Sequence, residues 1–436
     1  MSDARPLSVP ASRLSRFSKL GTMTAGVAGN MAVNGVAQLT KGQRPSMRGL
    51  LMTPANIRRV TDQLAKMRGA AMKVGQMVSM DTGEMLPPEL ADIMARLRDD
   101  AHFMPPAQLK KVLNAAWRDG WIKRFKHFDV RPIAAASIGQ VHRATLKDGT
   151  ELAIKVQYPG VAQSIDSDVA NVGTLIKMSG LLPKGFELKP YLAEARAQLH
   201  DETDYALEAH HLQRFHTLLK DDARFMVPQV YPEFSTDTIL AMSYIESRPI
   251  EEAAALPQEQ RNKIATDLID LLMQELCMFG AMQTDPNFAN YRFDPVTQKV
   301  VLLDFGATRD IADDIAQHYK NLLRAGLAGN RNQMEDLAHQ IGFVDDTVAE
   351  HHRAKIVDMM AMSFDALRAS DTYDFADRRL SQYMQREGLA LAEDGFVPPP
   401  LPVDVLFLQR KFGGVFLLAA KLGAKVEVTK TLLRYL

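Results

Sequence analysis

Four polar residues follow one another along the chain in an order that could carry out phosphoryl transfer. Lys155 lies in the strand-like run 153–156, where a lysine can point out of a sheet while its neighbours pack inward. Asp285 and Asn290 have the spacing D-x4-N, and Asp304 follows the hydrophobic run 300–303 as the first residue of Asp-Phe-Gly. Phosphoryl transfer needs Mg²⁺ held by hard oxygen ligands and a carboxylate near the attacking group, and this set supplies both.

Each of these pieces is weak by itself. A lone lysine on a strand is usually a solvated residue, and an Asp-Pro-Asn turn is ordinary loop chemistry. Their conjunction, in this order and on these elements, is typical of protein kinases. The sequence therefore predicts an enzyme that binds ATP and Mg²⁺.

The elements that must position these residues change character along the chain. Prolines near residues 54, 87 and 105 open three helical patterns within the first 125 residues. Two strand-like runs, 137–145 and 151–156, flank an Asp-Gly pair, which predicts a hairpin. The later predictions are helices at 161–178 and 189–219, strands at 228–231 and 238–244, and a mainly helical region after residue 246 that contains strands at 291–293 and 300–303.

This order predicts an α+β chain with a protein-kinase-like two-lobed fold and an N-terminal helical extension. Its length of 436 residues is in keeping with several units. The boundaries that we expect are an N-terminal extension over 1–45, a helical insertion over 46–128, a smaller kinase-like lobe over 129–246 and a helical lobe over 247–436.

Three departures separate the chain from ordinary protein kinases. The aspartate loop reads Gln-Thr-Asp at 283–285 instead of His-Arg-Asp, and no Ala-Pro-Glu follows Asp304. Ahead of Lys155 there is no glycine-rich loop, and an alanine-rich segment stands in its place. Because alanine resists backbone conformations that glycine adopts, this segment should hold a nucleotide differently.

The departures form a pattern that resembles the UbiB/ABC1/COQ8 family of atypical kinases, also called ADCK proteins. Lys-Val-Gly-Gln at 73–76 is similar to the KxGQ signature of that family, and the alanine-rich segment 134–142 is similar to its nucleotide loop. Glu202 and Asp204, with Glu208, resemble its ExD signature. Further matches are Ala-Ile-Lys-Val at 153–156, Gln-Thr-Asp-Pro-Asn at 283–287 and Asp-Phe-Gly at 304–306, so that the motifs span about residues 50–310.

The resemblance implies catalytic and cofactor roles for the matched residues. Lys155 would contact the phosphates and pair with Glu208, and Asp285 would be the catalytic loop aspartate. Asn290 and Asp304 would bind the metal. The loop against the nucleotide would consist of Ala134, Ala135, Ala136 and Ser137.

The resemblance also implies a regulatory insertion. Lys73, Gly75 and Gln76 would belong to a helical insertion that lies over the site where a kinase would bind a peptide. Glu202 and Asp204 would anchor that insertion from a neighbouring helix, since an unpaired buried lysine is costly. The structural alternative is that Lys73, Glu202 and Asp204 only hold helices together.

Composition excludes some classes of partner and site. Lys+Arg and Asp+Glu both total 52, so the chain has no basic field for nucleic acid, and we expect no nucleic-acid partner. The single cysteine excludes an intrachain disulfide and CxxC-type metal sites.

The run 20–40 is the nearest approach to a membrane-spanning segment. It is uncharged and close to the length of about 20 residues that a span needs, but glycine, asparagine and glutamine make it weakly apolar. We interpret it as an arm that is flexible or lies at a membrane surface. The alternatives are a membrane-inserted helix and a helix that mediates a homodimer. The C-terminal run 415–422 is too short to span, so we expect peripheral association.

The leading hypothesis is an atypical kinase or ATPase that supports ubiquinone or related isoprenoid-lipid biosynthesis, as the resemblance implies. Its partners would be ATP, a quinone-type lipid and enzymes of quinone biosynthesis. The need for ATP places it in the cytoplasm at the membrane periphery, or in mitochondria if the source is eukaryotic. The alternatives are a phosphotransferase that acts on a protein or small molecule, and a non-catalytic lipid-binding scaffold or chaperone.

Overall fold

The protein is described from a computed structural model that covers residues 67, 69–71, 73–75, 103–179 and 188–436. The predictions for residues 1–45 and for the helix that opens near residue 87 lie outside the described residues. The chain divides into two compact units, and each is described by itself. The first unit combines the chain up to His210 with Gln229–Tyr244, and the second combines His211–Pro228 with Ile245–Leu436.

The first unit contains a five-stranded sheet with the order β1-β3-β4-β6, in which β2 pairs with β3. The predicted hairpin is confirmed, because β3 and β4 pair antiparallel and Gly149 takes a left-handed φ of 94° in the turn between them. Lys155 lies between Val141 on β3 and Leu240 on β6, in the middle of the sheet. The strands are β1 (Phe125–Phe128), β2 (Ala134–Ala135), β3 (Gly139–Leu146), β4 (Glu151–Gln157) and β6 (Ile239–Ser243).

One face of this sheet is sealed by an apolar cluster. Leu152, Ile154 and Val156 alternate along β4 and are fully buried in it, which turns the intervening Lys155 to the other face. The helix α6 (Pro106–Trp117) and the short helices η2 (Trp121–Arg124) and η3 (Pro232–Phe234) supply the other side of the cluster. Its aromatic rings pack edge to face or tilted, and they include Trp117, Trp121, Phe125, Phe128 and Phe234.

Three helices follow the sheet: α7 (Val161–Ser179), α8 (Lys189–Glu202) and α9 (Tyr205–Leu219). The prediction of one helix over 189–219 is wrong, because the chain breaks at Thr203 and Asp204. The carbonyl of Thr203 accepts a hydrogen bond from Gln157 Nε2 at 2.6 Å, and the side chain of Asp204 caps α9 by accepting from Leu207 N at 2.8 Å. The predicted strand at 228–231 is also wrong, since only an isolated bridge joins Val230 to Met242 there.

The second unit carries two small sheets. A four-stranded sheet has the order β5-β10-β9-β7, and a separate pair joins β8 to β11 antiparallel. The predicted strands at 291–293 and 300–303 are confirmed as β9 and β10, the latter one residue shorter. The strand bounds are β5 (Phe225–Met226), β7 (Arg248–Pro249), β8 (Ala281–Gln283), β9 (Tyr291–Phe293), β10 (Val300–Leu302) and β11 (Thr308–Asp310).

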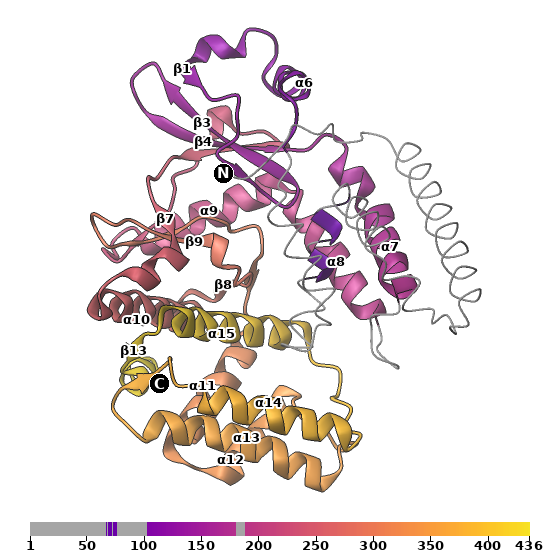
Figure 1. Cartoon of the computed structure of the whole chain (residues 1–436), viewed down its shortest axis with the longest axis vertical. Coiled ribbons are helices and arrows are strands. Elements are labelled where there is room, and N and C mark those ends of the chain that lie inside the picture. Colours follow the sequence, from indigo (N-terminus) through magenta and orange to yellow (C-terminus); the bar gives the residue numbers. More distant parts are fainter. Residues whose placement is uncertain (1–66, 68, 72, 76–102, 180–187) are drawn as a thin grey trace, which may run out of the picture. The chain divides into compact units, whose positions relative to one another are not determined.

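The rest of the second unit is helical. The helix α10 (Gln258–Gln274) runs into a π-helical turn, η5 (Glu275–Phe279), and lies beside α15 (Val403–Leu422) (Figure 1). A short strand pair joins β12 (Tyr373–Asp374) to β13 (Lys425–Val426). The remaining helices are η4 (Ile250–Ala255), η6 (Phe288–Asn290), α11 (Asp313–Ala328), α12 (Arg331–Ile341), α13 (Glu350–Arg368), α14 (Arg379–Glu393) and α16 (Val428–Leu433).

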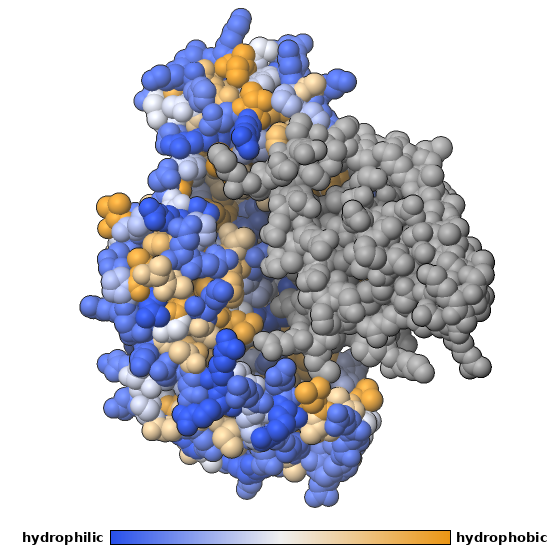
Figure 2. Space-filling model, viewed as in Figure 1, coloured by the Kyte–Doolittle hydropathy of each residue, from blue (hydrophilic) through white to orange (hydrophobic). Residues whose placement is uncertain are grey.

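The described surface is mainly polar. On the face that Figure 2 shows, hydrophilic residues dominate and apolar ones are scattered between them. Large exposed apolar side chains come from separate elements, such as Met278 on η5 and Leu417 on α15. Among the described residues, no helix is both long enough and apolar enough to cross a membrane.

Candidate nucleotide and metal site

Lys155 and Glu208 form a buried ion pair in the first unit. Lys155 Nζ lies 2.6 Å and 2.8 Å from the two carboxylate oxygens of Glu208, and the residues are only 8% and 2% exposed. The ammonium also lies 5.2 Å from the ring centroid of Tyr205, one turn earlier on α9. Because buried charges are costly, this contact offsets part of the cost of burying both groups. The structure thus brings together the two residues that the sequence predicted as partners.

The alanine-rich segment is part of the sheet. Ala134 and Ala135 form β2 and pair with Val141 and Gln140 of β3. The chain then turns tightly, and Ala136 N donates to Gly139 O at 2.9 Å. The predicted loop is therefore a short hairpin that is paired with β3, the strand that precedes β4.

Ser137, at the tip of this hairpin, is tied to the ExD and KxGQ residues. Its hydroxyl donates to the carboxylate of Glu202, and the other oxygen of that carboxylate lies 2.5 Å from Lys73 Nζ. Lys73 is buried, as is Gly75 in the same helical segment. Gln76 lies outside the described residues.

Close packing supports this polar contact. The position that a Cβ on Gly69 would take is 2.8 Å from the backbone oxygen of Ser137, so the helical segment that bears Lys73 lies directly against the hairpin tip. Glu202 ends α8, whereas Asp204 begins α9 as its cap. The two acidic residues of the ExD pattern thus have separate places: one contacts the inserted segment and the hairpin, and the other starts the helix that carries Glu208.

The second unit holds the predicted aspartate loop. Thr284 donates to Ala307 O through both its backbone N, at 3.0 Å, and its hydroxyl, at 2.6 Å, which joins this loop to the segment after Asp304. Asn290 Nδ2 lies 3.2 Å from the backbone oxygen of Asp285 and 3.4 Å from its Oδ2. Asp285 and Asn290 are therefore neighbours, and the amide nitrogen of Asn290 faces the aspartate.

Asp304 follows β10 at the edge of the same region. Its Oδ1 accepts a hydrogen bond from Gly306 N at 3.0 Å, which fixes the turn of the Asp-Phe-Gly triplet. Phe305 is buried and packs on Phe215 of α9, with ring centroids 4.8 Å apart. The triplet is held from both sides, by its own backbone and by an aromatic contact.

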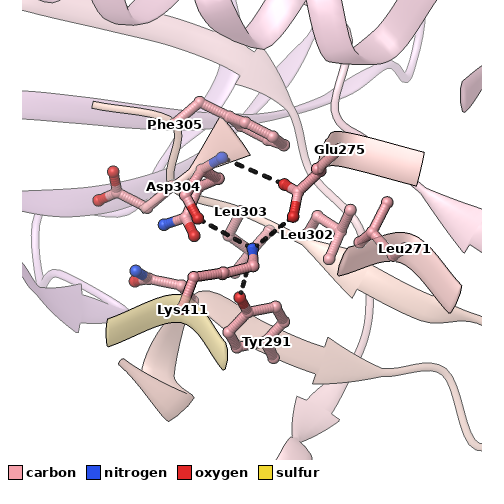
Figure 3. Close-up of a pocket in the computed structure, with 10 residues that line it drawn as sticks. Leu271, Glu275, Tyr291, Leu302, Leu303, Asp304, Phe305 and Lys411 are labelled. Carbon is pink, nitrogen blue, oxygen red and sulfur yellow. Dashed lines mark hydrogen bonds and ion pairs between the residues drawn. The ribbon is translucent and has the colours of Figure 1, made fainter. Parts of the chain in front are cut away.

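Asn290 and Asp304 line one small pocket of the second unit. Figure 3 shows Asp304 among the residues around this pocket. The side chains of Asp304 and Asn290 carry a carboxylate and a carboxamide, and the oxygens of such groups are ligands that Mg²⁺ takes. The pocket is also lined by Leu271, Glu275, Gln283, Tyr291, Leu302, Leu303, Phe305 and Lys411.

Two charged residues of this pocket were not predicted from the sequence. Lys411, from α15, and Glu275, from η5, are each 1% exposed, and their charged atoms lie 2.9 Å apart. Burial raises the pKa of Glu275, and the ammonium opposes that change. Burial would lower the pKa of Lys411, but Glu275 and Tyr291 outweigh it, so the pKa of Lys411 is raised and its ammonium is held charged. The sequence signal that could have identified Glu275 and Lys411 is that each is a charged residue within an otherwise mainly apolar helical run.

A group of three ligand-type residues lies away from this pocket. The Nε2 atoms of His351 and His352, at the start of α13, lie 3.1 Å and 3.0 Å from Asp394 Oδ2. Both imidazoles already contact the same oxygen, and two of the three side chains are largely exposed. We therefore assign this group to the packing of α13 against the end of α14.

The fold and these two sets of residues define a kinase-like protein. The ABC1 atypical kinase-like domain matches residues 96–338, more than half of the chain, and the chain belongs to that family. The atypical kinase COQ8, mitochondrial, of Saccharomyces cerevisiae is 39% identical, with 97% of this chain and 84% of that protein covered. The atypical kinase COQ8B, mitochondrial, of Rattus norvegicus is 37% identical, with 97% and 80% covered.

A solved structure shows the same fold. The complex of Rv3197 with erythromycin, from Mycobacterium tuberculosis, has a TM-score of 0.60 at 23% identity and covers 84% of this chain and 92% of that chain. The predicted family and the α+β kinase-like fold are confirmed, and so is the prediction of an atypical kinase at the level of the family. A kinase-like domain implies the use of ATP and a metal in general terms.

Proposed function

We propose that the chain binds Mg²⁺ and ATP and acts as an atypical kinase or ATPase that supports ubiquinone or related isoprenoid-lipid biosynthesis. The observation that carries the proposal is the buried contact of 2.6 Å and 2.8 Å between Lys155 and Glu208. In the catalytic conformation of kinases this pair is formed, and it presents the lysine to the phosphates. The family names of the relatives, COQ8 and COQ8B, support the link to quinone lipids.

ATP, when bound, supplies the phosphoryl group, and the metal supplies positive charge beside it. Lys155, held by Glu208, offers an ammonium for phosphate oxygens. Asn290 and Asp304 offer the oxygens that hold the metal, and Asp285 offers a carboxylate that can accept a proton from a hydroxyl or a water molecule. The hairpin formed by Ala134, Ala135, Ala136 and Ser137, whose serine contacts Glu202, would help to hold the nucleotide.

The proposed regulation comes from the contact of Ser137, Glu202 and Lys73. Ser137, at the tip of the nucleotide hairpin, and Lys73, in the KxGQ segment, contact the same carboxylate of Glu202. A movement of the KxGQ segment would therefore displace the hairpin. This contact supports a regulatory role for Lys73. We propose the same role for Gly75 and Gln76 of the same motif, with Asp204 fixing the start of the next helix. We further propose that the protein works at the periphery of a membrane, next to enzymes of quinone biosynthesis.

The biochemical test is Mg²⁺-dependent ATP hydrolysis by purified protein, compared between wild type and Asp304→Asn. We expect the variant to fold and to lose turnover by about a hundredfold or more, as removal of a major electrostatic contact does. Unchanged turnover in Asp304→Asn would refute the assignment of the metal ligand. Transfer of labelled phosphate to a defined acceptor, lost in Asp285→Asn, would favour the phosphotransferase instead.

The cellular test is the quinone content of a strain that lacks this gene. Rescue by wild type but not by Asp304→Asn is the expected result. Equal rescue by both would favour the non-catalytic scaffold. Normal quinone content in the deletion strain would refute a role of this protein in quinone biosynthesis.

A further inference from the structure

The helix α15 contacts the catalytic loop at two points that are three residues apart. Lys411 Nζ donates to Gln283 O at 2.9 Å. Gly414 lies so close to Pro286 that a Cβ added to the glycine would be 2.1 Å from the Cβ of the proline. Residues three apart lie on the same face of a helix. One face of α15 therefore contacts the loop both before Asp285, at Gln283, and after it, at Pro286.

The ion pair holds both backbone polar groups of Gln283. Glu275 Oε1 accepts from Gln283 N at 3.1 Å, while Lys411 donates to Gln283 O. Lys411 Nζ also lies 3.1 Å from the hydroxyl of Tyr291, the residue after Asn290 (Figure 3). The charged pair thus binds the backbone two residues before Asp285 and a side chain directly after Asn290.

A buried ion pair usually adds little to the free energy of unfolding compared with apolar residues. Well-packed apolar residues in the same space are often as stabilising, because both charges must be taken out of water. What apolar residues cannot do is donate to Gln283 O and accept from Gln283 N. A π-helical turn at Glu275–Phe279 brings Glu275 to this place, and such turns often mark functional sites.

The same helix also reaches the segment after Asp304. The guanidinium carbon of Arg309, on β11, lies 4.1 Å from the ring centroid of Phe407. The helix α15 (Val403–Leu422) lies beyond the residues 96–338 that match the family domain.

We propose that Lys411 and Gly414 make α15 the platform that positions the loop 283–290 for phosphoryl transfer, with Lys411 as a positioning residue. This rests on the proposed function. Lys411 fixes the loop backbone through Gln283, and Gly414 sets the distance of closest approach at Pro286. A C-terminal helix outside the matched domain thereby sets the geometry of Asp285 and Asn290.

The first experiment separates positioning from stability. Lys411→Met leaves Glu275 buried without its partner, whereas the double variant Lys411→Met with Glu275→Gln removes both charges and keeps an acceptor for Gln283 N. We expect the single variant to be strongly destabilised in urea and the double variant to regain most of that stability. Turnover of Mg²⁺-ATP should stay at least about tenfold below wild type in the double variant, with a smaller change in KM.

The second experiment uses adjacent glycines as a matched pair. In Gly414→Ala the new methyl group meets Pro286, while in Gly413→Ala nothing lies within 4 Å of the new methyl group. We expect Gly414→Ala to lose turnover at least about tenfold and Gly413→Ala to keep wild-type turnover. The two substitutions have the same intrinsic effect on the helix, so the difference between them isolates the contact with the loop.

Hydrogen exchange of the amides at 283–290 supplies a readout that needs no turnover. Faster exchange in the double variant and in Gly414→Ala, but not in Gly413→Ala, is the expected result. The proposal is overturned if the double variant regains turnover together with stability, or if exchange in this loop is the same in all variants. A wild type without ATPase activity would refute the proposed function, and the exchange data would still decide the positioning role.

Discussion

His142, on β3, is a buried histidine whose contacts require it to be neutral. Its Nδ1 lies 2.8 Å from Asp129 O, which can only accept, so Nδ1 must carry the proton. Its Nε2 lies 2.9 Å from Gln140 Nε2, which can only donate, so Nε2 must be the acceptor. The orientation of the Gln140 amide is fixed because its Oε1 accepts from Met104 N at 2.7 Å. A proton added to Nε2 would therefore face another donor.

The energetic consequence follows from linkage. Burial lowers the pKa of His142 from 6.5 to about 4, and the oxygen of Asp129 opposes that only in part. Between these two values the unfolded chain binds the proton and the folded chain does not, so acid favours unfolding. The contribution of His142 to the free energy of unfolding is full above about pH 6.5 and decreases as the pH falls to about 4. The total loss is about 3 kcal/mol, of which about 1.4 kcal/mol is lost by about pH 5.5.

The assay is urea unfolding at about pH 7.5 and about pH 5.5. The chain has 2 tryptophans, and both Trp117 and Trp121 lie in the first unit, so their fluorescence reports the unfolding of the unit that contains His142. His142→Asn removes the titrating group and can keep the donor to Asp129 O, and it should lose less stability than wild type on acidification. His127→Asn, at a largely exposed position, is the control and should behave as wild type does. Equal acid losses in wild type and His142→Asn would refute the reasoning.

Three further predictions concern the same unit and use the same fluorescence readout. Glu208→Gln should cost about 3 kcal/mol, because it removes the carboxylate that contacts the buried ammonium of Lys155, and an unchanged urea midpoint would contradict this. Gly139→Ala should cost about 1–3 kcal/mol, since its Cβ would lie 2.4 Å from a backbone oxygen of β4; wild-type stability would show that the strand can move aside. Lys73→Met should cost about 2 kcal/mol by leaving Glu202 without its cation, and a purely surface role would give no measurable loss.

Local sequence was sufficient to predict those elements that depend on a few consecutive residues. The hairpin around Gly149 followed from an Asp-Gly pair between two strand-like runs, and the hydrophobic run before Asp304 followed from its composition. Such elements are decided by turn chemistry and by the alternation of side chains, both of which are visible in a few consecutive residues. The break between α8 and α9 was missed because it depends in part on Gln157, a residue from a strand far away in the sequence.

Short motifs of consecutive residues were enough to identify the four residues of the proposed chemistry: Lys155, Asp285, Asn290 and Asp304. The position of Lys411 against the catalytic loop is visible only in the folded chain, because this lysine is 128 residues away in sequence from the Gln283 carbonyl that it binds. A lysine in a helix has no local property that distinguishes a buried clamp from a solvated residue. That distinction arises from long-range packing, which no pattern of consecutive residues specifies.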